Sequence, residues 1–255
     1  MPAAEADVRR LNFCEWVDRQ SAFVPAALWL AGARSEDAAT IDRLTPCGGL
    51  DLGPSDDLSA FALCWRLQTD AERYFTRVWY WVPEAALRAY HERPCAEWQV
   101  AGNVTITPGS VTDFAHVRDD VQRLAREHGC DEIAFDRRFA AQMAQELMGD
   151  GFTLIDQAQG FHLNEPTAKL EALLRADAFW HAGDPMTTWQ AGNLVVQRGR
   201  RGELRPDKQA SPEKIDGMVA ALMALGRAML HTAAPAASIY ETRGVLVLRP
   251  EGWIS

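Results

Sequence analysis

Residues 45–67 read as a strand, a tight turn and a second strand, and an acidic residue lies inside the first strand. The run 48–52 is short and apolar, as expected of a buried strand. Residues 53–56 are turn formers, and residues 59–67 are again apolar and aromatic. A carboxylate inside a buried strand costs several kcal/mol unless it is paired or bound to a metal. Asp51 therefore needs a partner there, or else it caps the turn with a hydrogen bond.

After a third strand, the pattern changes to helices alternating with strands. Alternation of this kind implies parallel strands joined by crossover helices, and hence an α/β fold with a mixed sheet. The final helix is predicted to begin with Ser211 as N-cap and Pro212 at its first position. The predicted strands or extended pieces after the first two are 73–82, 103–107, 132–136, 152–156, 179–181, 194–197 and 245–248, and the predicted helices are 84–91, 113–129, 139–147, 166–174 and one from 211.

Composition narrows the function classes. The chain has 255 residues, a length sufficient for one large domain or two small ones. Hydrophobic residues make up 47% of it, which supports a buried core. A net charge of -9 does not suggest a stand-alone basic nucleic-acid binder, although a carboxylate active site is itself acidic. The five cysteines form no CxxC pair, so neither a zinc site nor a disulfide framework is indicated. No apolar run or signal-peptide pattern indicates a membrane or secretion, and we expect a cytoplasmic protein.

Three aspartates occupy positions that one sheet edge can bring together. Asp51 lies in the first strand, Asp136 ends a later strand, and Asp216 falls in the second turn of the last helix. Sites in such sheets form at the carboxyl ends of strands. A central mixed sheet flanked by helices, with a packed final helix, is the ribonuclease H-like plan. Clustered carboxylates repel one another unless cations lie between them, and Mg²⁺ or Mn²⁺ prefers oxygen ligands. The alternative is three unrelated acids: a turn cap and two helix-terminus charges.

Residues 49–226 resemble the nuclease domain of the large terminase subunit of tailed bacteriophages. The matching motifs include Leu50-Asp51-Leu52, Ile133-Ala-Phe-Asp136, His181-Ala-Gly-Asp-Pro185, Arg205-Pro-Asp-Lys208 and Lys214-Ile-Asp-Gly217. The resemblance implies an endonuclease that cuts concatemeric double-stranded DNA during packaging, in the host cytoplasm. It implies that Asp51, Asp136 and Asp216 bind two divalent cations, Mg²⁺ or Mn²⁺, which would stabilise the attacking and leaving oxygens of a phosphodiester. It also implies three protein partners, namely the terminase ATPase motor, the small terminase subunit and the portal.

Two features depart from that family. No GxxxxGK[ST] motif occurs, so we expect no ATPase motor in this chain. Gly199 stands where relatives often have an aspartate, which removes a possible fourth acidic ligand.

Other residues are candidates for supporting roles. Lys208 matches the family pattern and could hold a scissile phosphate oxygen as a fourth catalytic residue. Asp57 is either a supporting carboxylate or a turn acceptor, and His181 either supports the site or, as we favour, packs at the core edge. A basic stretch beside Lys208 is either a DNA-contacting hairpin or a solvated turn; its arginines are Arg198, Arg200, Arg201 and Arg205.

The expected organisation is an N-terminal linker arm (1–44), a nuclease domain (45–232) and a C-terminal tail (233–255). Two other functions compete. Residues 50–55 resemble the first phosphate loop of actin-like ATPases and phosphotransferases, but Asp136 is followed by arginines where that class needs a glycine. A non-catalytic docking module of a packaging complex is the second alternative.

Overall fold

The computed structural model describes residues 23–35, 41, 44–67, 72–87, 98, 100–157 and 160–231. Its strands are β1 (Cys47–Asp51), β2 (Ser59–Leu67), β3 (Arg73–Pro83), β4 (Val104–Thr107), β5 (Glu132–Phe135), β6 (Thr153–Asp156), β7 (Phe179–His181), β8 (Val196–Arg198) and β9 (Leu204–Pro206). Seven of them form one sheet in the order β4-β3-β2-β1-β5-β6, with β7 also pairing with β3, while β8 and β9 form a hairpin. β1, β2 and β3 are antiparallel neighbours, and β5 and β6 run parallel to β1. The expected mixed sheet of the ribonuclease H-like plan is therefore present.

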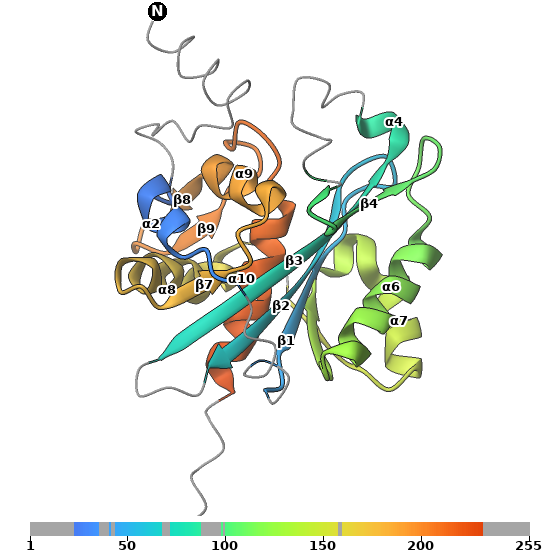
Figure 1. Ribbon diagram of the computed structural model, residues 1–255, viewed down its shortest axis with the longest axis horizontal. Helices are drawn as coiled ribbons and strands as arrows, with labels where there is room; N and C mark the ends of the chain where they lie inside the picture. The colour runs from blue at the N-terminus through green and yellow to red at the C-terminus, as the bar shows by residue number, and fades with distance from the viewer. Residues whose placement is uncertain are drawn as a thin grey trace, which may run out of the picture.

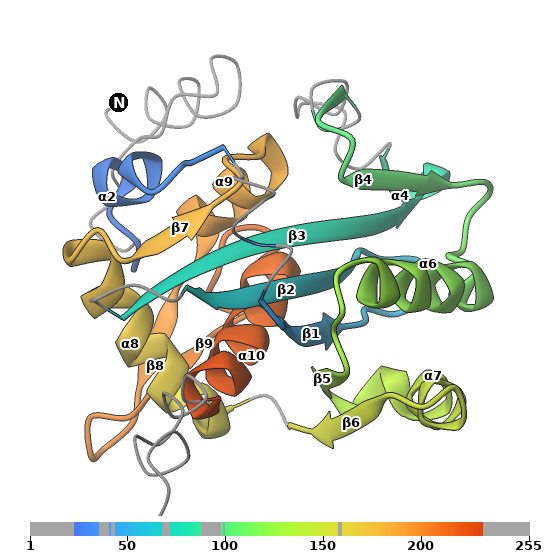
Figure 2. The same cartoon turned by 60° about the horizontal axis from the view of Figure 1, so that its bottom comes forward.

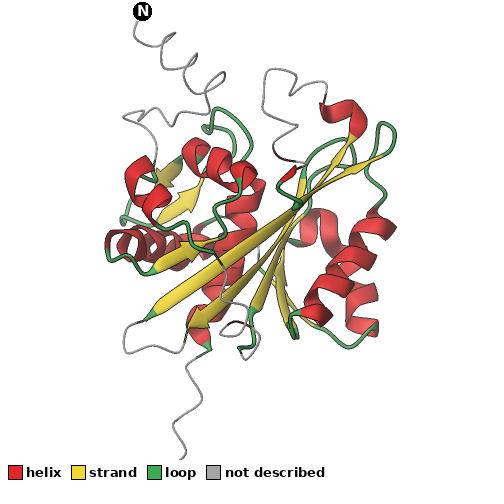
Figure 3. Ribbon diagram, viewed as in Figure 1, coloured by secondary structure: helices red, strands yellow, loops and turns green. Residues whose placement is uncertain are grey.

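Helices cover both faces of this sheet (Figures 1 and 3). They are α2 (Ala26–Ala31), α4 (Glu84–Leu87), α6 (Phe114–Glu127), α7 (Arg137–Gly149), α8 (Asn164–Arg175), α9 (Pro185–Asn193) and α10 (Asp216–Leu230), with a 3-10 turn, η2 (Phe161–Leu163). α6 and α7 lie on one side of the sheet, and α8, α9 and α10 lie on the other (Figure 2). Within the part of the chain described above, no helix is long and apolar enough to cross a membrane.

Side-chain size differs between the two faces of β2. Along β2, the small residues Ala60 and Ala62 belong to the core on the α10 side, whereas Phe61 and Leu63 belong to the core under α6 and α7. The alternation follows the two-residue period of a strand. Small residues on one face let α10 lie close against the sheet, while large ones fill the wider space under the helix pair.

Gly49 lets the backbones of β1 and α10 approach each other closely. A Cβ atom there would lie 2.1 Å from the carbonyl oxygen of Ala220 and 2.7 Å from the amide nitrogen of Ala224, both in α10. Because side chains alternate along a strand, Cys47, Gly49 and Asp51 all face this helix. The strand ends at Asp51 and the helix begins at Asp216, so the two elements run past each other in opposite directions.

Most predicted elements are confirmed, with three differences. The final helix begins at Asp216 rather than near Ser211, because the Ser211 hydroxyl donates to the Asp207 carbonyl (2.7 Å) instead of capping a helix. α9 was not expected, and β9 was expected only if the basic stretch formed a hairpin, which it does by pairing with β8. The helix predicted over 84–91 is described only as α4, and the strand predicted at 245–248 lies outside the described residues.

Residues 23–35 of the expected arm pack against the domain. Trp29 is buried and stacks on His181, with ring centroids 4.0 Å apart. Backbone bonds join Phe23 to Leu194 and Arg34 to His181. This part of the arm therefore contributes contacts to the core on the α9 side.

Candidate active site

Asp51 and Asp216 are brought together by the packing of β1 against α10. Asp51 is the last residue of β1 and is 1% exposed, and Asp216 is the first residue of α10 and is 6% exposed. The Lys208 ammonium donates to Asp51 Oδ2 and to Asp216 Oδ1, each at 2.7 Å. Two nearly buried carboxylates thus share one cation, and Asp51 has the partner that its position in a buried strand requires.

The electrostatics of Lys208 favour its charged form. Burial opposes the charge, but the carboxylates of Asp51 and Asp216 outweigh that effect and raise the pKa of Lys208 above its usual range. The residue follows the β8–β9 hairpin in a turn built around Asp207, whose side chain accepts from the amides of Gln209 and Ala210. The turn holds the ammonium between the two acids.

One oxygen of Asp216 has no partner among the described residues. Asp216 Oδ2 is buried and accepts no hydrogen bond there. An unsatisfied buried carboxylate oxygen is costly, and a bound cation or water would relieve that cost. The position of the Lys208 ammonium between the two acids already shows that the space accommodates positive charge. These residues therefore fit a hard divalent cation, which takes carboxylate oxygens as ligands.

The three predicted aspartates line one cavity of about 720 Å³. Asp136 reaches it from the end of β5, and its side chain also caps α7 by accepting from the Arg138 amide at 3.0 Å. Asp57 lines the same cavity, accepts from the Leu58 amide at 2.7 Å and pairs with Lys214. Both interpretations of Asp57, turn acceptor and supporting carboxylate, agree with this geometry.

Gln190, and Tyr80 with its partner Thr187, lie against the start of α10. The Gly217 amide donates to Gln190 of α9 at 2.7 Å, which satisfies one of the first amides of the helix. Tyr80 hydrogen-bonds Thr187 at 2.7 Å, and its hydroxyl lies 2.2 Å from where a Gly217 Cβ would be. Gln190 and Tyr80 thereby fix the backbone that carries Asp216. The motif around Lys214 had pointed to Gly217, but nothing in the sequence linked it to positions 80 and 190.

The predicted basic residues lie on the β8–β9 hairpin, beside Lys208 but outside the cavity lining. Arg198 ends β8, Arg200 and Arg201 are in the connecting turn, and Arg205 is in β9, where it donates to Gln197 at 2.6 Å. β9 ends at Pro206, two residues before Lys208. The basic hairpin therefore adjoins Lys208 along the chain.

His181 does not line the cavity; it ends β7, the short strand that pairs with β3. Its Nε2 atom bonds the Trp29 carbonyl at 2.9 Å, and its Nδ1 accepts from the Gly183 amide at 3.1 Å. Burial is the main cause that lowers the pKa of His181 to about 4. These contacts fit packing at the core edge, the role favoured from the sequence.

Burial of the neutral His181 imidazole predicts that the free energy of unfolding decreases at acidic pH. Because its folded pKa of about 4 lies below the ordinary 6.5, the stabilisation by neutral His181 is complete above pH 6.5 and lost as the pH falls toward 4. We expect up to about 3 kcal/mol of unfolding free energy to disappear across this range. Urea titrations of His181→Phe at several pH values should show a flatter pH dependence than wild type. His116→Asn is the control because that side chain is 51% exposed, and an equal slope in all three proteins would contradict the assignment.

The family model for the endonuclease domain of the terminase large subunit matches residues 9–232. The large terminase subunit of Enterobacteria phage HK97 is 29% identical over 237 residues, covering 89% of this chain and 45% of that protein. The crystal structure of the HK97 large terminase superposes with a TM-score of 0.71 at 27% identity, over 89% of this chain and 48% of that one. A large terminase nuclease from thermophilic phage G20c, crystallised with bound magnesium, shares the fold, with a TM-score of 0.53 at 13% identity over 82% and 99% of the two chains.

The chain spans about half the length of the curated relatives it matches. The family match, in contrast, includes every strand and helix described above together with Asp51, Asp136, Lys208 and Asp216. This chain belongs to the family of terminase large subunit endonuclease domains.

Proposed function

We propose that this chain is a metal-dependent endonuclease that cuts double-stranded concatemeric DNA during phage genome packaging. The observation that carries the proposal is the pair of nearly buried carboxylates, Asp51 and Asp216, held around one cationic position at the wall of an open cavity. A purely structural ion pair would not need a cavity of about 720 Å³ beside it. Membership of the terminase endonuclease family supports the same reaction.

Asp51, Asp136 and Asp216 are the proposed ligands of two divalent cations, Mg²⁺ or Mn²⁺. Their oxygens are the hard ligands that these ions take, and the unpartnered Asp216 Oδ2 offers one immediately. The G20c nuclease, which has the same fold, was crystallised with bound magnesium. When bound, such ions would offset the negative charge of the phosphodiester and make a water molecule more acidic.

Lys208 is the proposed contact for a scissile phosphate oxygen. Its ammonium already lies at the cavity wall, 2.7 Å from both acids, on a turn that restricts its backbone. As a compact point charge on a flexible stem, it can turn from a carboxylate to a phosphate without moving the turn. Arg198, Arg200, Arg201 and Arg205 would contact the DNA backbone beside it, which positions the duplex without reading its sequence.

The remaining partners are proposed from the family alone. The chain spans about half the length of its curated relatives. The proposed partners on the same DNA are an ATPase motor, a small terminase subunit and a portal. The boundaries of the arm (1–44), the nuclease domain (45–232) and the tail (233–255) stay predictions.

A plasmid-cleavage assay tests the proposed reaction directly. Supercoiled DNA is expected to become nicked and then linear with Mg²⁺ or Mn²⁺, and to stay intact with chelator. No cleavage by the folded protein with any divalent ion would favour the docking module. Saturable ATP binding would favour the actin-like alternative.

Lys208→Met is expected to destabilise the ion-free protein. The substitution leaves Asp51 and Asp216 close together and nearly buried without the shared cation, which raises their mutual repulsion. Because the lysine side chain is 36% exposed, solvent screens part of the pair, and we expect a loss of about 1–2 kcal/mol in chelator. Mn²⁺ should then raise the melting temperature of Lys208→Met more than that of wild type, since no ammonium competes for the same oxygens.

Cleavage by Lys208→Met should fall even where Mn²⁺ restores stability, because the phosphate contact is lost. Lys169→Met is the matched control: this lysine pairs with Glu72, outside the cavity lining. A variant with unchanged melting in chelator and unchanged cleavage would remove Lys208 from the site.

Deletion of residues 1–44 is expected to lower stability more than cleavage. The deletion removes the buried Trp29 ring and its stacking on His181, but none of the proposed ligands. Loss of one buried aromatic contact of this kind costs about 3 kcal/mol or more. Thermal melting should reveal the loss, and cleavage should be normalised to folded protein. A deletion variant with wild-type melting and no cleavage would contradict this prediction.

A further inference from the structure

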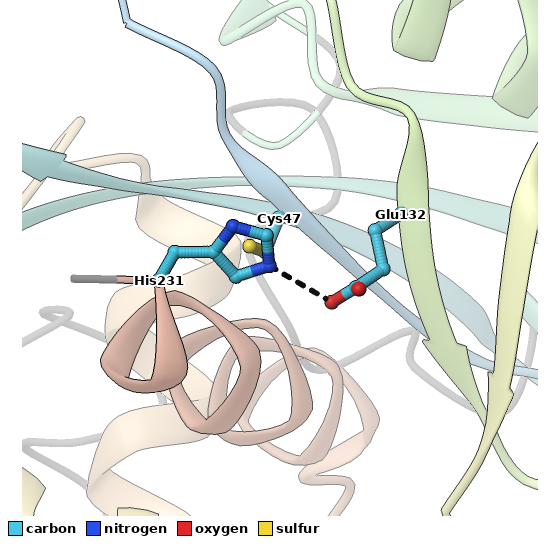
Figure 4. Close-up of side chains that lie close together, drawn as sticks. All are labelled: Cys47, Glu132 and His231. Carbon is cyan, nitrogen blue, oxygen red and sulfur yellow. Dashed lines mark hydrogen bonds and ion pairs between the residues drawn. The ribbon is translucent and has the colours of Figure 1, made fainter. Parts of the chain in front are cut away.

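A second group of potential metal ligands lies at the opposite end of β1 and α10 from the aspartates. Cys47 is the first residue of β1, Glu132 is the first residue of β5, and His231 follows the last turn of α10 (Figure 4). Cys47 and Glu132 are direct partners in the parallel register of the two strands. One ligand atom from each of the three side chains lies within 4.8 Å of the other two.

The contacts in this group run from the core to the surface. Cys47 is 2% exposed, the Glu132 side chain is 18% exposed, and the His231 side chain is 52% exposed. His231 Nε2 lies 3.3 Å from Glu132 Oε1, and the Arg227 Nε atom donates to the same oxygen at 2.6 Å. The ion pairs explain why Glu132, Arg227 and His231 lie together. They do not explain why the Cys47 thiol lies beside them. An ion could enter past His231, the ligand nearest to solvent.

The ligand types select the kind of ion. Sulfur, imidazole nitrogen and one carboxylate oxygen are the ligands of Zn²⁺-class ions, whereas Mg²⁺ and Mn²⁺ favour oxygen alone. Three protein ligands leave one tetrahedral position for water. We propose that Cys47, Glu132 and His231 bind one Zn²⁺ ion or a similar transition-metal ion. This ion would link the end of α10 to β1 and β5. Cys47 binds as thiolate, so its thiol proton passes to solvent on binding.

This site is separate from the proposed nuclease site. It shares no residue with Asp51, Asp136, Lys208 or Asp216, and Gly49 lies between Cys47 and Asp51 on the same face of β1. Each end of the β1–α10 pair then carries its own ion, a hard one beside the aspartates and a softer one beside the thiol. Binding at the thiol end can be measured without DNA, so its failure is distinguishable from failure of the proposed nuclease function.

Cobalt binding to the full chain tests the proposal, because Co²⁺ bound to a thiolate has a charge-transfer absorption band. The titration uses a background of Asp51→Asn with Asp216→Asn, which suppresses binding at the acidic site. We expect one Co²⁺ per chain with a thiolate band, displacement by Zn²⁺, and a higher melting temperature with Zn²⁺. Cys47→Ser should abolish the band, and His231→Ala should weaken Co²⁺ binding by at least about tenfold. Cys64→Ser and Cys130→Ser are the matched controls, since both thiols are fully buried nearby but outside the ligand group, and both should keep the band.

Several outcomes would overturn the site. A folded protein without the thiolate band, a band that survives Cys47→Ser, or Co²⁺ affinity unchanged by His231→Ala would each exclude it. His231 is half-exposed, so its substitution tests the ligand even if Cys47→Ser fails to fold. Arg227→Gln adds a further check: it frees Glu132 Oε1 from its cationic partner and should tighten Co²⁺ binding. Weaker binding by Arg227→Gln in a folded protein would count against Glu132 as a ligand.

Discussion

Asp51→Asn is expected to reduce DNA cleavage by at least about 100- to 1,000-fold, the loss that follows removal of one preorganised charge-stabilising group. Asparagine keeps the shape of the side chain, and its amide oxygen can still accept from Lys208. It removes the negative charge that a divalent cation requires, so metal affinity and the activation of water should fall together. Asp216→Asn should behave in the same way, because both carboxylates contact the same ammonium.

Stability measurements separate this loss from misfolding. In chelator, Asp51→Asn weakens the ion pair with Lys208 but also relieves repulsion from Asp216, and these effects oppose each other, so little change in melting temperature is expected. Mn²⁺ should raise the melting temperature of wild type much more than that of the variant. Asp119→Asn, at a side chain 62% exposed, is the control and should resemble wild type in both assays. Equal Mn²⁺ stabilisation of wild type and Asp51→Asn would remove Asp51 from the ligand set.

Gly49→Ala is expected to lower the melting temperature by roughly 6–12 °C, the shift for a protein of this size when overpacking costs about 3 kcal/mol. The new Cβ atom would lie 2.1 Å from the Ala220 oxygen and 2.7 Å from the Ala224 nitrogen. Both are backbone atoms, so no side-chain rotation can relieve the clash and α10 must move away from β1. The same movement displaces Asp216 from Asp51, and cleavage per folded molecule should fall as well.

Gly149→Ala is the matched control for this prediction. A Cβ atom at Gly149 has nothing within 4 Å, and its backbone is not in the left-handed region. The control should melt like wild type or slightly above it, because alanine restricts the unfolded chain. Differential scanning calorimetry of both variants measures the two effects. Equal melting of Gly49→Ala and wild type would contradict the close contact between β1 and α10.

The pattern of apolar residues predicted the bounds of the sheet strands better than the start of the last helix. β2 was predicted with its observed bounds because most of its residues are apolar or aromatic and turn residues precede it. The start of α10 was misplaced because Ser211-Pro212 has the residue types of a helix start, yet the Ser211 hydroxyl bonds Asp207 and accepts from the Val195 amide. Local sequence could not reveal that the hydroxyl would make these two contacts instead of capping a helix.

The sequence allowed us to predict which residues line the cavity, but not the contacts between them. Asp51, Asp136, Lys208 and Asp216 are the four catalytic residues that the family resemblance implied; all four line one cavity, and their catalytic roles stay predictions. The bridge made by Lys208 between two acids was not foreseen, because it depends on the turn at Asp207 and on the close packing of α10. α9 was missed because its buried face includes polar residues such as Gln190 and Asn193, so it has no apolar stripe.

The pairing of β1 with α10 also dictates when the site can exist during synthesis. The Asp51–Lys208 hydrogen bond joins residues 157 positions apart, so the ribosome must add that many residues after the first acid before its partner exists. At 5–20 residues per second this takes roughly 8–30 s. During that interval α10 has not been synthesised, so nothing from this helix covers the face of β1 around Gly49. Asp51 also has neither Lys208 nor Asp216 beside it. A chain interrupted before residue 216 would therefore lack one of the two carboxylates that contact Lys208.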